Sequence, residues 1–249
     1  MSRTLHARGL RYAYPGGRPA LDGLDLHVGH RERVAILGPN GAGKTTFMLH
    51  LNGLLKGEGE LEVAGLPVTK PNLRELRARV GLVFQDPDDQ LFMPTVGEDV
   101  AFGPVNLGVE DVPSRVTEAL AAVRLEGFED RAPHQLSMGE RRRVAIATVL
   151  AMRPALLVLD EPSASLDPRS RRELLQILET IGATLVVTTH DLLFAAELCD
   201  RTVILAAGRV VADGPTGELL ADAELLARYD LELPAGTDLT RIERLSSTT

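Results

Sequence analysis

Apolar and polar residues alternate near the start of the chain. In Leu24-Asp25-Leu26-His27-Val28 every second side chain is apolar, which is typical of a strand with one buried face. This segment lies within Leu21–Val28, and Pro15-Gly16-Gly17 separates it from an earlier apolar stretch at Leu5–Tyr12. We therefore predict two strands joined by a turn.

Farther along the chain, short apolar runs alternate with segments of helical character. Strands are predicted at Val34–Leu37, Leu61–Val63, Val80–Phe84, Ala155–Leu159, Leu185–Thr188 and Val203–Leu205. Helices are predicted at about Gly43–Leu54 and at Pro113–Leu125, Glu140–Met152, Pro168–Ile181 and Asp191–Leu198. Asp167 fits the N-cap position before Pro168, and Gly182 fits a C-terminal cap. The alternation predicts an α/β fold with a central parallel sheet.

The segment between Gln85 and Ser137 has helix signals but no clear strand. We predict a helical insertion at about 86–136 within a main domain that spans 1–234. The polar stretch Ala235–Thr249 is predicted to be a loosely ordered tail.

The strongest chemical signal is Gly38-Pro39-Asn40-Gly41-Ala42-Gly43-Lys44-Thr45, which fits G-x-x-x-x-G-K-[ST] between a predicted strand and a predicted helix. Glycines let backbone N–H groups turn inward and surround phosphate oxygens at a helix N-terminus. Lys44 can reach the outer phosphates, and the Thr45 hydroxyl suits Mg²⁺. The alternative is a glycine-rich turn in which the lysine has no function. It fits poorly with a loop that joins a predicted strand to a predicted helix, so the motif predicts nucleotide binding.

A second signal is the apolar strand Leu156–Leu159, which ends in Asp160 and Glu161. Alone, it could be a strand end with two solvated carboxylates. After a phosphate-binding loop it is interpreted as a Walker B strand. Asp160 would then hold Mg²⁺, and Glu161 would polarise the attacking water.

The third signal, Leu136-Ser137-Met138-Gly139-Glu140, is also a capping box, because Ser137 precedes Glu140 by three residues and an apolar run follows. That structural interpretation explains both residues without any ligand. It does not explain why Arg141-Arg142-Arg143 comes next, with the Walker B strand just downstream.

Together these motifs resemble the ATPase subunits of ABC transporters over nearly the whole chain. Leu136–Glu140 is similar to their signature motif, usually Leu-Ser-Gly-Gly-Gln, from which Met138 and Glu140 depart. Other similar elements are the D-loop at Ser165-Leu166-Asp167, the Q-loop glutamine at Gln85, the switch histidine at His190 and the adenine-stacking aromatic residue at Tyr14. The resemblance implies a P-loop NTPase fold of ABC type, with a mostly parallel central sheet, an N-terminal antiparallel β part and a helical insertion.

The resemblance also implies a site and its cofactors, ATP and Mg²⁺. Nucleotide binding is assigned to Tyr14, Gly38, Pro39, Asn40, Gly41, Ala42, Gly43, Lys44, Thr45, Thr46, Gln85, Ser137 and Gly139. The metal is assigned to Thr45, Gln85 and Asp160, and catalysis to Glu161 and His190. Because the signature contacts are assigned to Ser137 and Gly139, which are both present, we expect activity to survive the two departures.

In such ATPases two subunits associate head to tail, and the signature motif of one covers the ATP held by the other. The implied partners are a second ATPase subunit, identical or a close paralogue, an integral membrane coupling protein and a substrate-binding membrane subunit. The coupling protein would dock on the helical insertion. The expected location is peripheral, on the cytoplasmic face of the cell membrane.

A finer resemblance concerns the transporter class. Phe84–Phe92 and Asp99–Pro104 look like the Q-loop region of energy-coupling-factor importers, and Arg142–Ala147 and Leu231–Pro234 look most like their cobalt/nickel branch. This implies an importer, with cobalt or nickel ions as the expected cargo. With six scattered His and one Cys, the subunit itself is not expected to bind the transported ion.

The charge and cysteine content of the chain exclude further classes of partner and site. The formal charge is −8, and an acidic chain is a poor candidate for sequence-independent nucleic-acid binding, so no nucleic-acid partner is expected. The single cysteine, Cys199, excludes an intrachain disulfide framework and a CxxC site, which is compatible with a reducing compartment.

Uncharged apolar runs such as Val144–Met152 fall short of the roughly 18 residues that span a bilayer. The N-terminus lacks the apolar core of a signal peptide. We therefore expect a soluble protein that reaches a membrane only through a partner.

Two alternatives remain beside the metal-ion importer. One is an importer of another cargo, such as a vitamin or an amino acid. The other is a soluble ABC ATPase that acts on DNA or the ribosome, although the chain shows no coiled-coil insertion, second cassette or basic surface of the usual kind. A Rossmann dehydrogenase is excluded, because the glycine-rich loop ends in Lys44-Thr45 and no matching G-x-G-x-x-G is present.

Overall fold

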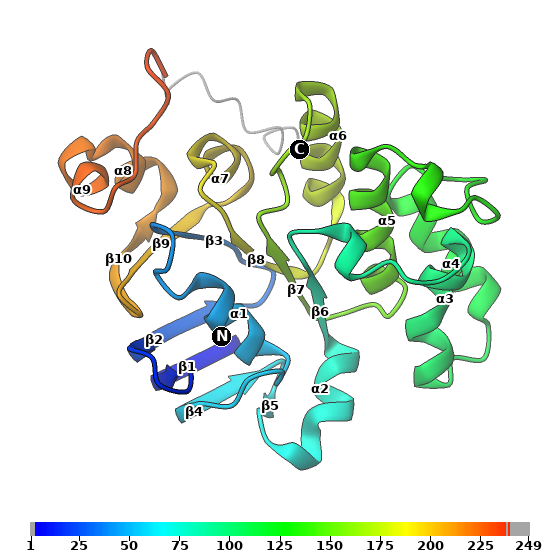
Figure 1. The fold of residues 1–249 in the computed structure, drawn as a ribbon, viewed down its shortest axis with the longest axis horizontal. Helices are drawn as coiled ribbons and strands as arrows, with labels where there is room; N and C mark the ends of the chain where they lie inside the picture. The colour runs from blue at the N-terminus through cyan, green and yellow to red at the C-terminus, as the bar shows by residue number, and fades with distance from the viewer. Residues whose placement is uncertain (1–2, 238, 240–249) are drawn as a thin grey trace.

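The computed structural model describes residues 3–237 and 239, and its described strands form two sheets (Figure 1). The smaller sheet is antiparallel in the order β2-β1-β4-β5. Its strands are β1 (Arg3–Ala13), β2 (Pro19–Gly29), β4 (Glu58–Val63) and β5 (Leu66–Pro67). The predicted strand pair at the start of the chain is thus confirmed as β1 and β2.

The larger sheet has the order β10-β9-β3-β8-β7-β6. Its strands are β3 (Arg33–Leu37), β6 (Val80–Val83), β7 (Leu156–Asp160), β8 (Thr184–Thr188), β9 (Arg201–Ala206) and β10 (Arg209–Pro215). Neighbouring strands are parallel except β9 and β10. The prediction of an α/β fold with a mostly parallel sheet and an N-terminal antiparallel part is therefore confirmed.

Helices cover both faces of the larger sheet. On one side α1 (Lys44–Leu51) packs between the two sheets, and on the other lie α5 (Met138–Leu150), α6 (Pro168–Thr180) and α7 (Leu192–Leu198). Figure 1 shows α3 (Val96–Leu107) and α4 (Val112–Ala122) beside α5, and both helices lie within the residues 86–136 for which a helical insertion is predicted. The remaining elements are α2 (Leu73–Arg79), α8 (Thr216–Ala221), α9 (Ala223–Arg228) and the 3₁₀ turns at Lys70–Asn72, Pro87–Asp89 and Pro133–Gln135.

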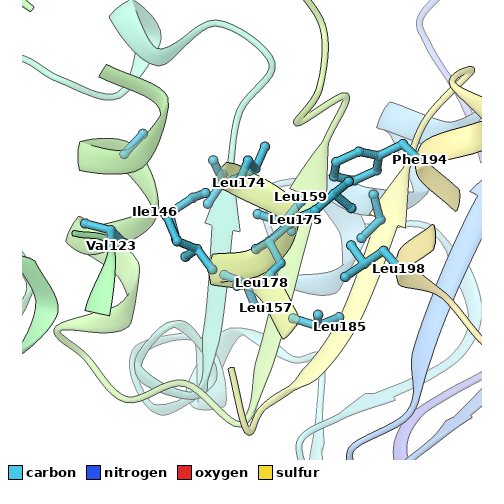
Figure 2. Packing of buried hydrophobic residues seen from close by; sticks show 14 of the residues in the cluster. Val123, Ile146, Leu157, Leu159, Leu174, Leu175, Leu178, Leu185, Phe194 and Leu198 are labelled. Atoms are coloured by element: carbon cyan, nitrogen blue, oxygen red, sulfur yellow. The ribbon is translucent and has the colours of Figure 1, made fainter. Parts of the chain in front are cut away.

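The central strands contribute alternate side chains to two cores. On β7, Leu157 and Leu159 face the helices of the outer side, whereas Leu156 and Val158 face α1 and the antiparallel sheet. Figure 2 shows the first core, in which Leu157, Leu159 and Leu185 meet side chains that include Leu174, Leu175, Leu178, Phe194 and Leu198. Because both faces of β7 are buried, its run is apolar throughout and ends in carboxylates only at the edge of the sheet.

Local signals set the helix starts but not every helix end. Asp167 caps α6 by accepting from the backbone N–H groups of Arg169 and Ser170, with Pro168 at the first helical position as predicted. The prediction for Gly182 is wrong: α6 ends at Thr180, Ile181 is extended, and Gly182 does not adopt the left-handed conformation. The helix stops because the chain turns directly into β8, so a glycine cap is not needed.

The predicted tail at 235–249 lies mostly outside the described residues. Within the described part of the chain, no helix is both long enough and apolar enough to cross a membrane.

Candidate nucleotide site

The loop between β3 and α1 has a shape that only glycine permits at two positions. At Gly38, with φ of 150°, a Cβ would lie 2.1 Å from the carbonyl oxygen of Leu205. At Gly43, with φ of 103°, it would lie 2.3 Å from the carbonyl oxygen of Ala20. Both glycines therefore let the loop press against the backbone of neighbouring segments.

Lys44 begins α1 and is buried within this loop. Its Nζ donates to the carbonyl oxygens of Gly38, at 2.6 Å, and Pro39, at 3.2 Å. Burial lowers the pKa of this ammonium, while the nearby Glu161 and Asp160 carboxylates act in the opposite direction. A cation and a turned backbone at a helix N-terminus form a site for the phosphate groups of a nucleotide.

Asp160 lies at the end of β7, next to Thr45 and Thr188. Its Oδ2 accepts from Thr45 Oγ1 at 3.1 Å, and its Oδ1 accepts a short hydrogen bond from Thr188 Oγ1. Burial raises the pKa of the Asp160 carboxyl even though both hydroxyl donors favour the ionised form. A hydroxyl and a carboxylate side by side at the phosphate loop are the oxygen donors that Mg²⁺ uses together with phosphates and water. The residues present thus fit the predicted metal.

Glu161 is held in a strained conformation beside Asp160. Its φ is 44°, a left-handed value for a residue with a side chain, and its N–H donates to the carbonyl oxygen of Thr188 at 2.8 Å. The carboxylate Oε2 accepts from Thr189 Oγ1 at 3.1 Å and from the His190 N–H at 3.2 Å, and it lies 2.8 Å from His190 Nδ1. Such a fixed carboxylate next to the phosphate loop is placed to accept a proton from water.

Tyr14 and Gln85 complete the site from two other segments. The Tyr14 ring is half-exposed, meets Tyr12 edge to face at 5.0 Å between ring centroids, and has its hydroxyl 3.3 Å from Thr46 Oγ1. It can therefore offer an aromatic surface to a base. Gln85 follows β6 and lines the same cavity.

The cavity has a volume of about 530 Å³ and joins segments that are far apart in the sequence. Its lining residues are Tyr14, Ala20, Asn40, Gly41, Ala42, Gly43, Lys44, Thr45, Thr46, Gln85, Asp160, Glu161 and His190. Most of the residues predicted for the site thus gather at one place.

Ser137 and Gly139 do not line this cavity. Ser137 caps α5, with its hydroxyl donating to Glu140 Oε2 at 2.7 Å and accepting from the Glu140 N–H at 3.3 Å. A Cβ at Gly139 would lie 2.6 Å from Ser170 Oγ, so this glycine allows α5 to approach the first turn of α6. The capping box is therefore present, and these two residues do not contact the nucleotide cavity of their own chain.

Sequence reasoning missed Thr188 and Thr189, which hold the two carboxylates. Their role depends on the parallel register that sets Asp160 beside Thr188. The run Thr188-Thr189-His190 at a strand end was the available signal, but without the strand order it could not be tied to Asp160 and Glu161.

Comparisons with known proteins agree with this geometry. Residues 21–164 match the family model described as ABC transporter. A Streptomyces coelicolor relative, named provisionally as an ABC transporter ATP-binding protein, is 58% identical over 238 residues, which cover 94% of this chain and 92% of the relative. The energy-coupling factor transporter ATP-binding protein EcfA of Methanothermobacter thermautotrophicus is 47% identical, with coverage of 97% and 80%. The solved structure of cbiO1 from Clostridium perfringens, described as part of the ABC transporter complex cbiONQ, has a TM-score of 0.82 and 37% identity, and the match covers 94% of this chain and 97% of that one.

Proposed function

Because this chain belongs to the ABC transporter family of ATP-binding subunits, we propose that it drives an importer of the energy-coupling-factor type. Members of the family bind ATP and hydrolyse it to power transport, and this chain is such an ATPase. The observation that carries ATP binding and hydrolysis is the one cavity in which Tyr14, the phosphate loop, Gln85, Asp160, Glu161 and His190 meet, and the likeness to EcfA and cbiO1 supports the energy-coupling-factor type.

In the proposed mechanism each segment of the cavity has one task. Tyr14 stacks on the adenine, and Lys44 with the loop N–H groups binds the phosphates. Thr45, Gln85 and Asp160 would hold Mg²⁺, which supplies charge neutralisation at the phosphates. Glu161, already fixed by Thr189 and His190, orients the attacking water and accepts its proton. The His190 side chain is 69% exposed, so its ring can leave Glu161 and turn towards the γ-phosphate while the His190 N–H still holds the carboxylate.

We propose that Ser137 and Gly139 contact the nucleotide that is bound to a second subunit. ABC ATPases work as dimers with membrane components. In this chain the two residues lie at the N-terminus of α5, a 13-residue helix, outside their own nucleotide cavity. A helix N-terminus attracts anions, so it suits the γ-phosphate bound to a facing copy or a close paralogue. A head-to-tail dimer would therefore complete both sites.

The docking surface proposed for the integral membrane coupling protein is an apolar groove of about 760 Å³. Leu54, Phe92 and Phe102 line it and are largely exposed, and the Phe92 and Phe102 rings meet edge to face at 5.0 Å. Gln90 also lines the groove, a few residues from Gln85 in the nucleotide cavity. An apolar helix of the membrane protein is the partner that such a groove fits. The subunit would then be peripheral, on the cytoplasmic face of the membrane.

We propose cobalt or nickel ions as the cargo. The proposal is supported by the likeness to cbiO1 of the cbiONQ complex and to EcfA, together with the sequence segments that resemble the cobalt/nickel branch. A substrate-binding membrane subunit would recognise the ion, and this chain would supply the energy.

The test is purification of the tagged subunit from detergent-solubilised membranes, followed by identification of the proteins that accompany it. We expect integral membrane proteins with the parent and with Ala121→Asp, an exposed substitution on α4 outside the groove, and their loss with Phe92→Asp. ATP binding should be equal in all three. Partners that persist with Phe92→Asp would contradict the docking surface. Uptake of labelled cobalt and nickel by cells with and without the gene tests the cargo separately.

A further inference from the structure

Three consecutive arginines follow the signature-like motif in the first half of α5, and each contacts a different part of the molecule. The Arg141 Nε lies 3.3 Å from an Asp88 carboxylate oxygen, in the turn after β6. Arg143 donates to the carbonyl oxygens of Val123 and Arg124, both at 3.2 Å, beyond the end of α4. These two arginines therefore tie α5 to the helical insertion and to the segment after β6.

Arg142 contacts the segments that line or border the nucleotide cavity. One guanidinium nitrogen donates to the carbonyl oxygen of Phe84 at 3.1 Å and, in a shorter bond, to that of Gln85. The other nitrogen donates to the carbonyl oxygen of Ala164 at 3.4 Å. Ala164 lies between Glu161 and the D-loop-like segment Ser165–Asp167. The forked guanidinium thus bridges the Gln85 backbone and the backbone that follows the catalytic carboxylate.

The burial of Arg142 makes this bridge unusual. The residue is 2% exposed, and none of the ion pairs found within the described residues includes it. Burial lowers the pKa of the guanidinium, while Asp86 and Asp160 act against that shift, and an arginine remains protonated. A buried cation without a paired carboxylate costs more free energy than an apolar side chain of similar volume. The contribution of Arg142 to the protein is therefore the position in which it holds two backbone segments, Phe84–Gln85 and Ala164.

We propose that Arg142 is a positioning residue that couples the two composite nucleotide sites of the dimer. It lies on α5, whose N-cap Ser137 and first-turn Gly139 would contact the γ-phosphate of the facing subunit, and it holds the backbone of Gln85 beside its own cavity. Movement of α5 towards the facing nucleotide would then be transmitted to Gln85. The inference rests on the roles proposed above for Gln85 and for the Ser137–Gly139 segment.

A lysine at position 142 cannot form the same set of hydrogen bonds. Arg142→Lys retains the positive charge, but one ammonium cannot reproduce a planar fork that bonds to separate segments. Arg142→Gln removes the charge as well. Arg143→Gln is the matched control, because it removes a neighbouring arginine that also bonds to backbone carbonyls, but those of the helical insertion.

The experiment measures ATP affinity, kcat, KM, the Hill coefficient for ATP and thermal stability of the full chain, with Gln85→Ala as a reference. For Arg142→Lys we expect kcat about tenfold lower, a Hill coefficient near that of independent sites, and ATP affinity within about twofold of the parent. Arg143→Gln should lower thermal stability but leave kcat within about threefold. Where Arg142→Gln fails to fold, Arg142→Lys decides the question.

The outcomes separate the two proposals. Parental kcat and cooperativity in Arg142→Lys, with kcat impaired in Gln85→Ala, would overturn the coupling role of Arg142 alone. Parental kcat in Gln85→Ala would overturn the role proposed for Gln85. Equal losses in Arg142→Lys and Arg143→Gln, each in proportion to the loss of folded protein, would reduce Arg142 to a structural residue.

Discussion

The hydrogen bond from Thr188 to Asp160 has an effect on stability that depends on pH. Thr188 is fully buried, and its hydroxyl donates to a carboxylate whose pKa burial raises. Replacing Thr188 by Val keeps the shape of the side chain and removes the donor. The pKa of Asp160 should then rise further, because the ionised form loses a stabilising partner.

The magnitude follows from the charge of the acceptor. A hydrogen bond to an ionised group contributes about 1.5–3 kcal/mol, which corresponds to a change of about ten- to hundredfold in the folding equilibrium. This stability is present only where Asp160 is ionised in the folded protein, and it is lost as the pH falls through the raised pKa. The free-energy difference between Thr188→Val and the parent should therefore be largest at neutral pH and shrink in acid.

Thr184 on the same strand provides the control. It is also fully buried, but its hydroxyl accepts from the Arg31 N–H at 2.9 Å and donates to Thr4 Oγ1 at 3.2 Å, and no charged group takes part. Thr184→Val should cost about 1 kcal/mol at every pH. The assay is equilibrium urea unfolding of the three proteins without nucleotide, in a pH series from about 7.5 to about 4. A Thr188→Val difference that stays constant with pH would refute the reasoning.

Three further predictions concern hydrolysis, dimerisation and the core. Glu161→Gln should keep ATP binding, abolish most turnover and trap an ATP-bound dimer, as seen in turnover and gel-filtration assays; a parental rate would exclude Glu161 as the base. Gly139→Ala should weaken that dimer, because its Cβ meets Ser170, and Ser170→Gly in the same chain should restore it; no defect in gel filtration would contradict the close approach. In urea unfolding Leu185→Ala should cost about 2–5 kcal/mol, whereas Leu54→Ala, at a residue 49% exposed, should stay within about 0.5 kcal/mol; similar costs would contradict the assigned core.

Features that depend on neighbours in the sequence were predictable. The phosphate loop, the carboxylates that end β7 and the caps at Ser137 and Asp167 are all encoded within a few residues. The expectation that Gly182 caps α6 was wrong because tertiary structure, with β8 following at once, ends that helix.

Features that depend on tertiary packing were not predictable. Helical character was predicted for 86–136, but the bounds of α3 were not, because its Gly97, Gly103 and Pro104 are typical helix breakers. In the fold Gly103 instead permits close packing, since a Cβ there would lie 2.7 Å from the Cγ of Met152. The roles of Thr188 and Arg142 were not predicted for a similar reason, because both residues bond to residues that lie far away in the sequence.

The place of β3 in the larger sheet has a consequence for biosynthesis. Its two hydrogen-bonded neighbours are β8 and β9, where Arg33 pairs with Leu185 and Val34 with Arg201. During synthesis the phosphate loop and β7 emerge from the ribosome before β8 and β9. Until β8 and β9 emerge, β3 has no hydrogen-bonded neighbour on either side. ATP cannot therefore act as a folding ligand early in translation. Nucleotide affinity should arise late and abruptly, when the segment through Ala206 emerges and supplies both neighbours of β3.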